Sequence, residues 1–262
     1  MSVAIITGAS SGLGMDFAKV IAKKPEVDSL WLIARRTERL EALQKELQKP
    51  CKILSLDLSK AMSLEEYQKL LQSENPEVSY LVNAAGFGKF GSYHSVPVET
   101  AFNMIDLNVK ALVFFSQNTL PFMKENGRII QMGSASTYNP LPYLNVYAAT
   151  KSFVKVYSRA LHRELKPRKI TVTTVCPGWV QTEFFSRADI DTNSKKSFAK
   201  PMVSSVDVVK KAVRDADRGK DISMYGLFNK THHFLAKILP HRLIMRLWMG
   251  MAKKELSDDE LN

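Results

Sequence analysis

The sequence predicts an α/β fold, a single domain with a doubly wound, mostly parallel seven-stranded sheet and helices on both faces. Two observations predict it: apolar runs alternate with segments of helical periodicity, and a glycine-rich turn joins the first apolar run to the first helix. Strands that alternate with helices favour a parallel sheet, and right-handed crossovers place a ligand cleft at the carboxyl ends of its strands. The predicted strands are residues 3–6, 30–34, 53–56, 80–83, 128–132, 172–176 and 222–225.

The helices are predicted between these strands, the first over residues 15–23. Residues 39–47 show the pattern well, with leucines on one face, a Glu41–Lys45 pair four residues apart, and Thr37 placed to cap the start. We expect residues 1–262 to form one domain with three parts. They are a cofactor-binding and catalytic core (1–185), a polar substrate lid (186–205) and a C-terminal amphipathic extension (228–262).

Composition bounds the function. The chain of 262 residues has a formal net charge of +11, but its basic residues are spread without a dense run, which favours a solvated basic surface over nucleic-acid binding. No opening segment combines a basic start with a long apolar run, so we expect a cytoplasmic protein. Cys51 and Cys176 lie in or beside apolar runs and are expected to be buried thiols. The histidines show no metal-ligand spacing, and His232, His233 and His241 are expected on a surface helix.

The glycine-rich turn spans residues 7–14 and follows an apolar strand. Gly8 allows a tight turn, Gly12 lets the backbone approach a pyrophosphate, and Gly14 allows close packing of the helix. The helix N-terminus offers free N–H groups and a positive dipole end to phosphates. The turn therefore predicts a dinucleotide site, although by itself it is also compatible with a structural role.

Tyr147 and Lys151 lie four residues apart in a segment that reads as a helix, and Ser134 lies thirteen residues before Tyr147. Residues four apart share a helix face, so the ammonium group is placed to stabilise a phenolate. A phenol has a pKa of about 10 in water, and acid–base catalysis near neutrality requires the pKa to fall by about two to three units. The trio predicts a proton-transfer site.

Together these motifs resemble the short-chain dehydrogenase/reductase superfamily, in its compact, NADP-preferring form. The resemblance runs over about residues 3–221 and implies a Rossmann fold. Its landmarks occur in the family's order: the glycine turn, Asp57, the Asn-Ala-Ala-Gly segment 83–86, Asn108, Ser134, Tyr147 with Lys151, and Pro177-Gly178 with Thr182.

The resemblance implies hydride transfer between a nicotinamide and a carbonyl or secondary alcohol. Ser134 would polarise the carbonyl oxygen, Tyr147 would protonate the alkoxide, and Lys151 would hold the nicotinamide ribose and lower the tyrosine pKa. Asn108 matches the residue whose helix kink keeps a water in the proton relay, and a buried structural amide is an equal alternative. Gly133 stands where many relatives carry another serine, but the thirteen-residue spacing to Tyr147 selects Ser134 as the catalytic hydroxyl, and Ser136 is the alternative.

Cofactor choice depends on Arg35 and Arg36, which follow the second strand where an acidic residue would receive a ribose 2′-hydroxyl. No carboxylate stands there in the sequence, and guanidinium groups bind a 2′-phosphate well, so we predict NADP(H) over NAD(H). Two exposed arginines are the alternative, which the helix dipole disfavours. The predicted cofactor residues are Gly8, Ser10, Ser11, Gly12, Leu13, Gly14, Arg35, Arg36, Asp57, Leu58, Asn83, Ala84, Gly86, Tyr147, Lys151, Pro177, Gly178, Val180 and Thr182.

Aromatic residues cluster in the segments expected around the cleft, which suggests an apolar pocket for a lipid-like or steroid-like ketone or alcohol. We expect Phe90, Tyr143, Trp179, Phe184 and Phe185 to line it. Residues 228–252 form a basic amphipathic stretch that is suited to a membrane surface, to closing the pocket, or to packing against a second subunit. We favour packing within the protein or its oligomer.

The leading hypothesis is an NADP(H)-dependent oxidoreductase that acts on an apolar alcohol or ketone. The first alternative is a catalytically silent NADP(H)-sensing regulator on the same fold, and the second is a basic protein of nucleic acids or membrane surfaces. The resemblance also implies a homodimer or homotetramer formed through helices at residues 100–117 and 147–166.

Overall fold

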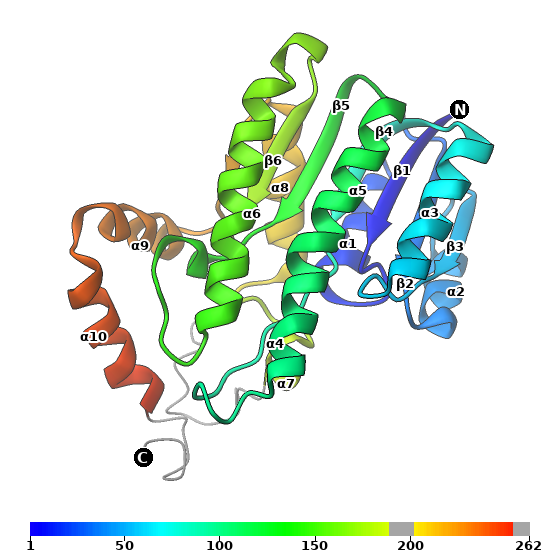
Figure 1. Ribbon diagram of the computed structural model, residues 1–262. Coiled ribbons are helices and arrows are strands. Elements are labelled where there is room, and N and C mark those ends of the chain that lie inside the picture. Colours follow the sequence, from blue (N-terminus) through cyan, green and yellow to red (C-terminus); the bar gives the residue numbers. More distant parts are fainter. Residues whose placement is uncertain (189–201, 254–262) are drawn as a thin grey trace.

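The sheet has seven strands in the order β3-β2-β1-β4-β5-β6-β7, and every neighbouring pair is parallel. The computed structural model describes residues 1–188 and 202–253 (Figure 1). Both the fold class and the number of strands are therefore confirmed. The strands are β1 (Ser2–Thr7), β2 (Ser29–Ala34), β3 (Cys51–Ser55), β4 (Glu77–Asn83), β5 (Met123–Met132), β6 (Thr171–Val175) and β7 (Ile222–Ser223).

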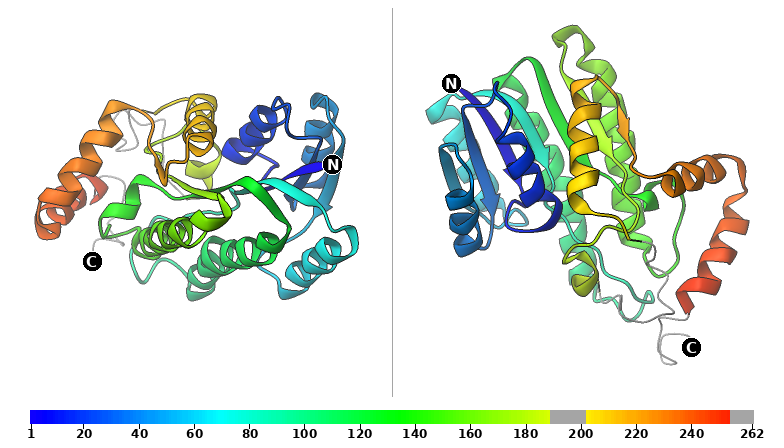
Figure 2. Two further views of the ribbon diagram at one scale, coloured as in Figure 1. Left: turned by 90° about the horizontal axis from the view of Figure 1, so that it is seen from above. Right: turned by 180° about the vertical axis from the view of Figure 1, so that it is seen from behind.

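Helices cover both faces of the sheet because successive residues of each strand point to opposite sides. On β1, Ala4 and Ile6 join one core with α1 (Gly12–Ile21), α2 (Thr37–Glu46) and α8 (Ser205–Asp217). Val3 and Ile5 join the other core, with α3 (Ala61–Glu74), α5 (Leu112–Thr119) and α6 (Asn145–Glu164). Figure 2 shows the two layers on either side of the sheet.

The strand order reverses between β1 and β4. From β1 the chain adds β2 and β3 toward one edge of the sheet, and from β4 it adds β5, β6 and β7 toward the other. Ligands of doubly wound folds bind at such a reversal, beyond the carboxyl ends of the strands. The glycine turn leaves β1 there, and Ala84 follows β4 there. The topology thus brings the predicted cofactor segments together.

The start of α2 differs from the sequence prediction. Thr37 is the first helical residue, Arg36 precedes it, and no side chain caps the helix. The Thr37 hydroxyl instead pairs with the Ser55 hydroxyl at 2.7 Å, at the end of the neighbouring strand β3. The prediction of a Thr37 cap was wrong because the hydroxyl found a partner across the sheet edge.

The remaining helices lie in the connections at the two ends of the strands. A π-helix (Asp106–Ala111) joins α4 (Val98–Ile105) to α5, and short 3₁₀ helices span Leu120–Phe122, Ala135–Tyr138 and Lys166–Arg168. The short α7 (Phe184–Arg187) precedes residues 189–201, so most of the predicted lid lies outside the described residues. The final pair, α9 (Leu227–Ile238) and α10 (His241–Ala252), extends from one end of the domain (Figures 1 and 2).

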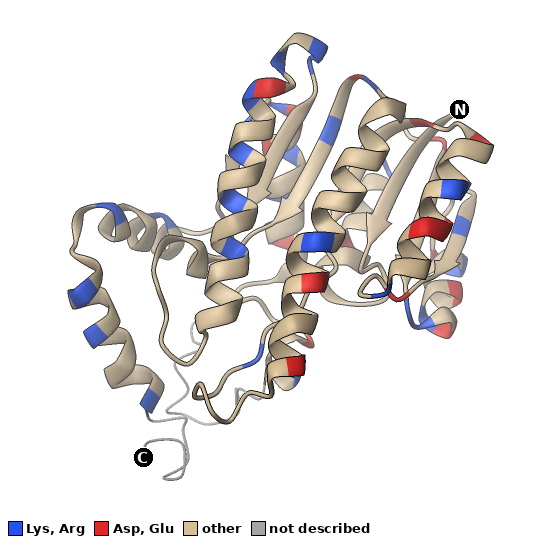
Figure 3. Cartoon of the chain, viewed as in Figure 1, with Lys and Arg blue, Asp and Glu red and all other residues tan. Residues whose placement is uncertain are grey.

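Charged side chains of both signs are distributed over the helices of the main domain (Figure 3). The helices α9 and α10 differ, because their sequences contain basic residues and no Asp or Glu. Within residues 1–188 and 202–253, no helix combines the length and the apolar character needed to cross a membrane.

Candidate active site

The glycine turn brings three backbone segments into contact at the end of β1. Gly8 has a φ of +71°, and a Cβ atom added there would lie 2.8 Å from the backbone nitrogen of Ala85. A Cβ atom on Gly14 would lie 2.2 Å from the carbonyl oxygen of Gly8. Only glycine fits both positions, and the N-terminal turn of α1 consequently opens onto the cleft.

The three predicted catalytic side chains converge beyond the ends of β4 and β5. Helix α6 carries Tyr147 and Lys151 on one buried face, and the Lys151 ammonium lies 5.7 Å from the centroid of the Tyr147 ring. Ser134 follows β5, where its hydroxyl accepts a hydrogen bond from the Ser136 nitrogen at 3.2 Å. The Ser134 side chain also interacts with the Tyr147 side chain.

Burial governs the protonation of this pair. It raises the pKa of Tyr147 to about 12, and the interaction with Ser134 offsets this only in part. Burial also lowers the pKa of Lys151 to about 8. The Lys151 ammonium donates to the Met132 carbonyl at 2.7 Å. The expected lowering of the tyrosine pKa by Lys151 is therefore not found, because burial desolvates the phenolate and raises the pKa.

Asn108 lies inside the π-helix, at the irregularity that the resemblance implied. Its buried amide accepts a hydrogen bond from the Phe87 nitrogen at 3.0 Å and donates to the Phe87 carbonyl at 2.9 Å and the Thr150 hydroxyl at 3.1 Å. A Cβ atom on Gly86 would lie 2.8 Å from the Asn108 carbonyl oxygen and 3.4 Å from the Lys151 ammonium. Asn108 therefore joins the segment after β4 to α6 beside Lys151.

An apolar cavity of about 280 Å³ lies over the predicted catalytic residues Ser134, Tyr147 and Lys151. Of the predicted substrate residues, Trp179, Phe184 and Phe185 line it. The C-terminal helices contribute residues that sequence reasoning had not assigned to the pocket, namely Phe228, Asn229, His232, Trp248 and Met251. In the described part of the extension, α9 and α10 therefore form one side of the cavity, and His232, which is partly buried, lines it.

A second cavity of about 620 Å³ extends from the glycine turn along the carboxyl edge of the sheet. The two cavities share Leu13, Gly86, Thr182 and Phe184 among their lining residues, so they adjoin beside the catalytic trio. Predicted cofactor residues in the second cavity are Gly8, Ser10, Ser11, Gly12, Leu13, Gly14, Arg35, Arg36, Asp57, Leu58, Ala84, Gly86 and Thr182. Tyr147, Lys151, Pro177, Gly178 and Val180 line the first.

Three of the predicted cofactor and substrate residues lie elsewhere. Asn83 is buried in the sheet, where its amide donates to Ser116 and Gln131, and it lines neither cavity. Phe90 and Tyr143 also lie outside the apolar cavity, and their rings pack against one another with centroids 6.2 Å apart. The two cavities therefore give these three assignments no support: the Asn83 amide is used within the sheet, and a loop sequence does not reveal which aromatic rings turn inward.

A family model described as short chain dehydrogenase matches residues 2–193. The chain belongs to the short-chain dehydrogenase family. It is 35% identical over 190 residues to an NADP-dependent 3-hydroxy acid dehydrogenase of Salmonella typhi. The aligned region covers 70% of this chain and 75% of the relative.

Solved structures agree with this assignment. A short-chain dehydrogenase from Sphingobium yanoikuyae in complex with NADPH superimposes with a TM-score of 0.77 at 27% identity, over 92% of this chain and 97% of that one. The closed form of a serine dehydrogenase complexed with NADP⁺ gives a TM-score of 0.74 at 30% identity, over 86% and 94%. This short-chain dehydrogenase is accordingly an oxidoreductase.

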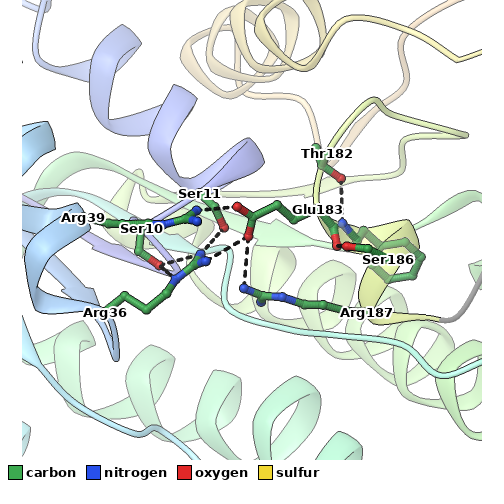
Figure 4. Close-up of polar contacts among 9 residues, drawn as sticks. Ser10, Ser11, Arg36, Arg39, Thr182, Glu183, Ser186 and Arg187 are labelled. Atoms are coloured by element: carbon green, nitrogen blue, oxygen red, sulfur yellow. Dashed lines mark hydrogen bonds and ion pairs between the residues drawn. The ribbon is translucent and has the colours of Figure 1, made fainter.

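The dehydrogenase also has a charged cluster that the sequence did not predict. Arg36, Arg39 and Arg187 all contact the carboxylate of Glu183 at the rim of the second cavity (Figure 4). The sequence contained partial signals, since Arg39 follows Arg36 by three residues and Arg187 follows Glu183 by four, spacings that place side chains on one helix face. The sequence next to Arg36 contains no carboxylate at the predicted ribose position, but the fold brings the carboxylate of Glu183, 147 residues away, into contact with Arg36. The expectation of no carboxylate near Arg36 was therefore wrong.

Proposed function

We propose that this dehydrogenase uses NADP(H) and transfers hydride between the nicotinamide and a carbonyl or secondary alcohol carbon of an apolar substrate. The observation that carries the proposal is the position of Ser134, Tyr147 and Lys151 where the apolar cavity adjoins the larger cleft. The larger cleft has the features of a dinucleotide site: a turn in which Gly8, Gly12 and Gly14 carry no Cβ atom, a helix N-terminus, and the arginines that follow β2.

The proposed roles of Ser134, Tyr147 and Lys151 follow from their positions and their protonation. Bound NADPH supplies the hydride for reduction of a ketone. The Ser134 hydroxyl donates a hydrogen bond to the carbonyl oxygen. Tyr147, whose pKa is raised to about 12 by burial, holds its proton at neutral pH and gives it to the oxygen as negative charge develops there. Lys151 places a buried positive charge beside that proton donor and, in our proposal, binds the nicotinamide ribose.

The preference for NADP(H) rests on Arg35 and Arg36, which line the cleft beyond β2. The names of the similar proteins support it, since the Salmonella relative is described as NADP-dependent and both solved structures contain NADP(H). A guanidinium group matches the geometry and charge of a phosphate.

The proposed substrate is a neutral lipid-like or steroid-like ketone or alcohol. Trp179, Phe184 and Phe185 line the cavity together with Trp248, and Lys151 is the one Lys, Arg, Asp or Glu among the described lining residues. Burial lowers the pKa of His232, so this histidine is neutral at pH 7 and offers no second cation to a substrate carboxylate. The wall therefore favours neutral substrates over hydroxy acids.

The proposal is tested by measuring NADPH oxidation with steroid, bile-acid, fatty and small aromatic ketones, and with 3-oxo acids as the charged comparison. We expect at least one neutral ketone to be reduced with a higher kcat/KM than the 3-oxo acids, and NADPH to be preferred over NADH. Faster reduction of the 3-oxo acids would contradict the substrate class. Equal use of NADH would contradict the cofactor choice.

We also propose that two copies of the chain associate through α4 and α6. Phe102 and Ile105 on α4, and Phe153 and Val156 on α6, are large apolar side chains that are 43–66% exposed. Such side chains on adjacent helices suit a self-complementary interface. Light scattering should give a dimer or tetramer mass, and Phe102→Lys should reduce it, whereas a monomer at all concentrations would contradict the proposal.

A further inference from the structure

The cluster around Glu183 joins two parts of the chain at the far end of the cleft. Arg36 and Arg39 come from the start of α2, whereas Glu183 and Arg187 belong to the segment of α7. Arg36 contacts the carboxylate at 3.0 Å and Arg187 contacts it at 3.2 Å, while Arg39 binds its other oxygen. Three positive charges thus meet one negative charge, so the cluster retains a formal excess of two positive charges.

The hydrogen-bond donors of Arg36 are almost fully used. A guanidinium group has five N–H donors. In Arg36, Nε donates to the Ser10 hydroxyl, Nη2 donates to the hydroxyls of Ser10 and Ser11, and Nη1 donates to Glu183 (Figure 4). One donor remains. A phosphate cannot bind this arginine through two N–H groups unless one of these partners gives way.

Of the three residues that bind Arg36, Glu183 is the one whose displacement costs the least free energy. Ser10 and Ser11 are fixed in the glycine turn, and their hydroxyls are themselves suited to bind a phosphate. The Glu183 side chain is 38% exposed and needs only to turn into solvent. A phosphate monoester carries a charge of about −1.5 to −2 and three acceptor oxygens, against one charge and two oxygens for a carboxylate. It matches the cluster's excess charge better than Glu183 does.

Glu183 is also linked to the substrate cavity through its neighbour in the chain. Phe184 lines both cavities, and its ring lies 5.3 Å from the ring of Tyr147. Phe185 packs beside Trp179 with ring centroids 5.8 Å apart. A movement of Glu183 therefore changes the wall next to the catalytic tyrosine.

We propose that Glu183 occupies the 2′-phosphate subsite of the cofactor-free protein, and that the 2′-phosphate displaces it and releases the segment carrying Phe184. The inference rests on the proposed use of NADP(H). Glu183 competes with the phosphate at all pH values of interest, because its hydrogen bond with Arg39, followed by that with Arg36, lowers the carboxyl pKa to about 2.

The test compares Glu183→Gln with the wild type by calorimetry, using adenosine 2′,5′-bisphosphate and 5′-AMP as probes. We expect Glu183→Gln to bind the bisphosphate about three- to tenfold more tightly, because the competing ion pairs are lost, and to bind 5′-AMP with unchanged affinity. Glu38→Gln is the matched control, since Glu38 lies between the two arginines in sequence, in the first turn of α2. It removes the same charge outside the cluster and should change bisphosphate affinity less than twofold.

Weaker or unchanged bisphosphate binding by Glu183→Gln would overturn the proposal. If the wild type binds the bisphosphate no better than 5′-AMP, the NADP(H) proposal fails and this inference fails with it. If the wild type binds the bisphosphate more tightly than 5′-AMP but Glu183→Gln does not change the bisphosphate affinity, only the proposed displacement of Glu183 is contradicted.

A second readout tests the link to the substrate cavity. Trp179 and Trp248 both line that cavity, so their fluorescence reports on its wall. The bisphosphate should change the tryptophan emission of the wild type, whereas 5′-AMP should not. The change caused by the bisphosphate should be smaller in Glu183→Gln, because the ion pairs between residue 183 and the arginines are already lost. Identical responses in the two proteins would overturn the coupling.

Discussion

At the scale of single residues, the site depends on two titratable groups whose charged forms are disfavoured by burial. Tyr147 keeps its proton because its pKa is raised to about 12, and Lys151 releases its proton more easily because its pKa is lowered to about 8. In the reductive direction Tyr147 acts as the acid, so its protonated form is the active one throughout the ordinary pH range.

Lys151 therefore sets the pH dependence of the free enzyme. The ammonium form is present below its pKa and is lost as the pH rises, so kcat/KM for NADPH should fall as the pH passes about 8. In Lys151→Arg, kcat/KM for NADPH should stay level up to about pH 10, at whatever value the variant has at pH 7, because a guanidinium group does not lose its proton in this range. A wild-type profile that stays level to that pH, or the same fall in the variant, would contradict this assignment.

At the scale of elements, the glycine turn shows how backbone packing creates the dinucleotide cleft. Gly14→Ala would place a Cβ atom 2.2 Å from the Gly8 carbonyl oxygen, and both groups belong to backbone that is held in the turn. We expect the free energy of unfolding to fall by about 1–3 kcal/mol and NADPH binding to weaken. Gly250→Ala on α10 is the control, since among the described residues no atom beyond the neighbouring residues and the backbone of its own helix lies within 4 Å of the added Cβ. This variant should raise the free energy of unfolding by about 0.5–1 kcal/mol. Equal changes in urea denaturation would contradict the packing argument.

The elements that could be predicted from sequence are those with a local signal. The strands were recognisable as apolar runs, and the spacing of Tyr147 and Lys151 placed both on one face of α6. The approach of Glu183 to Arg36 could not be predicted, because it depends on contacts between segments 147 residues apart. The pairing of Asn83 inside the sheet and the direction of Phe90 likewise depend on tertiary packing, which periodicity does not encode.

At the scale of the whole molecule, the C-terminal helices α9 and α10 form part of the wall of the apolar cavity. Trp248 of α10 lies with its ring centroid 6.5 Å from that of Trp179 and donates to the Pro142 carbonyl at 2.7 Å. The Asn229 side chain of α9 packs directly against Gly178, where an added Cβ would lie 2.2 Å from its carbonyl oxygen. The helix pair is thereby joined to both the loop before α6 and the segment after β6.

Trp248→Ala should open the cavity without disturbing the dinucleotide cleft. We expect KM for a bulky ketone to rise about tenfold through lost apolar contact, with NADPH affinity unchanged. Leu247→Ala is the matched control, because Leu247 is 59% exposed on the same helix. Steady-state kinetics with both variants checks the prediction, and a similar KM for the two proteins would show that α10 does not form the substrate wall.

The central claim is that Tyr147 gives the proton that accompanies hydride transfer from NADPH. The most direct measurement is the single-turnover rate of ketone reduction by Tyr147→Phe, with NADPH affinity measured on the same protein. The account predicts a rate about 10²- to 10⁴-fold below that of the wild type, at unchanged NADPH affinity, because only the phenolic oxygen is removed. A variant that binds NADPH normally and reduces the ketone at the wild-type rate would contradict it.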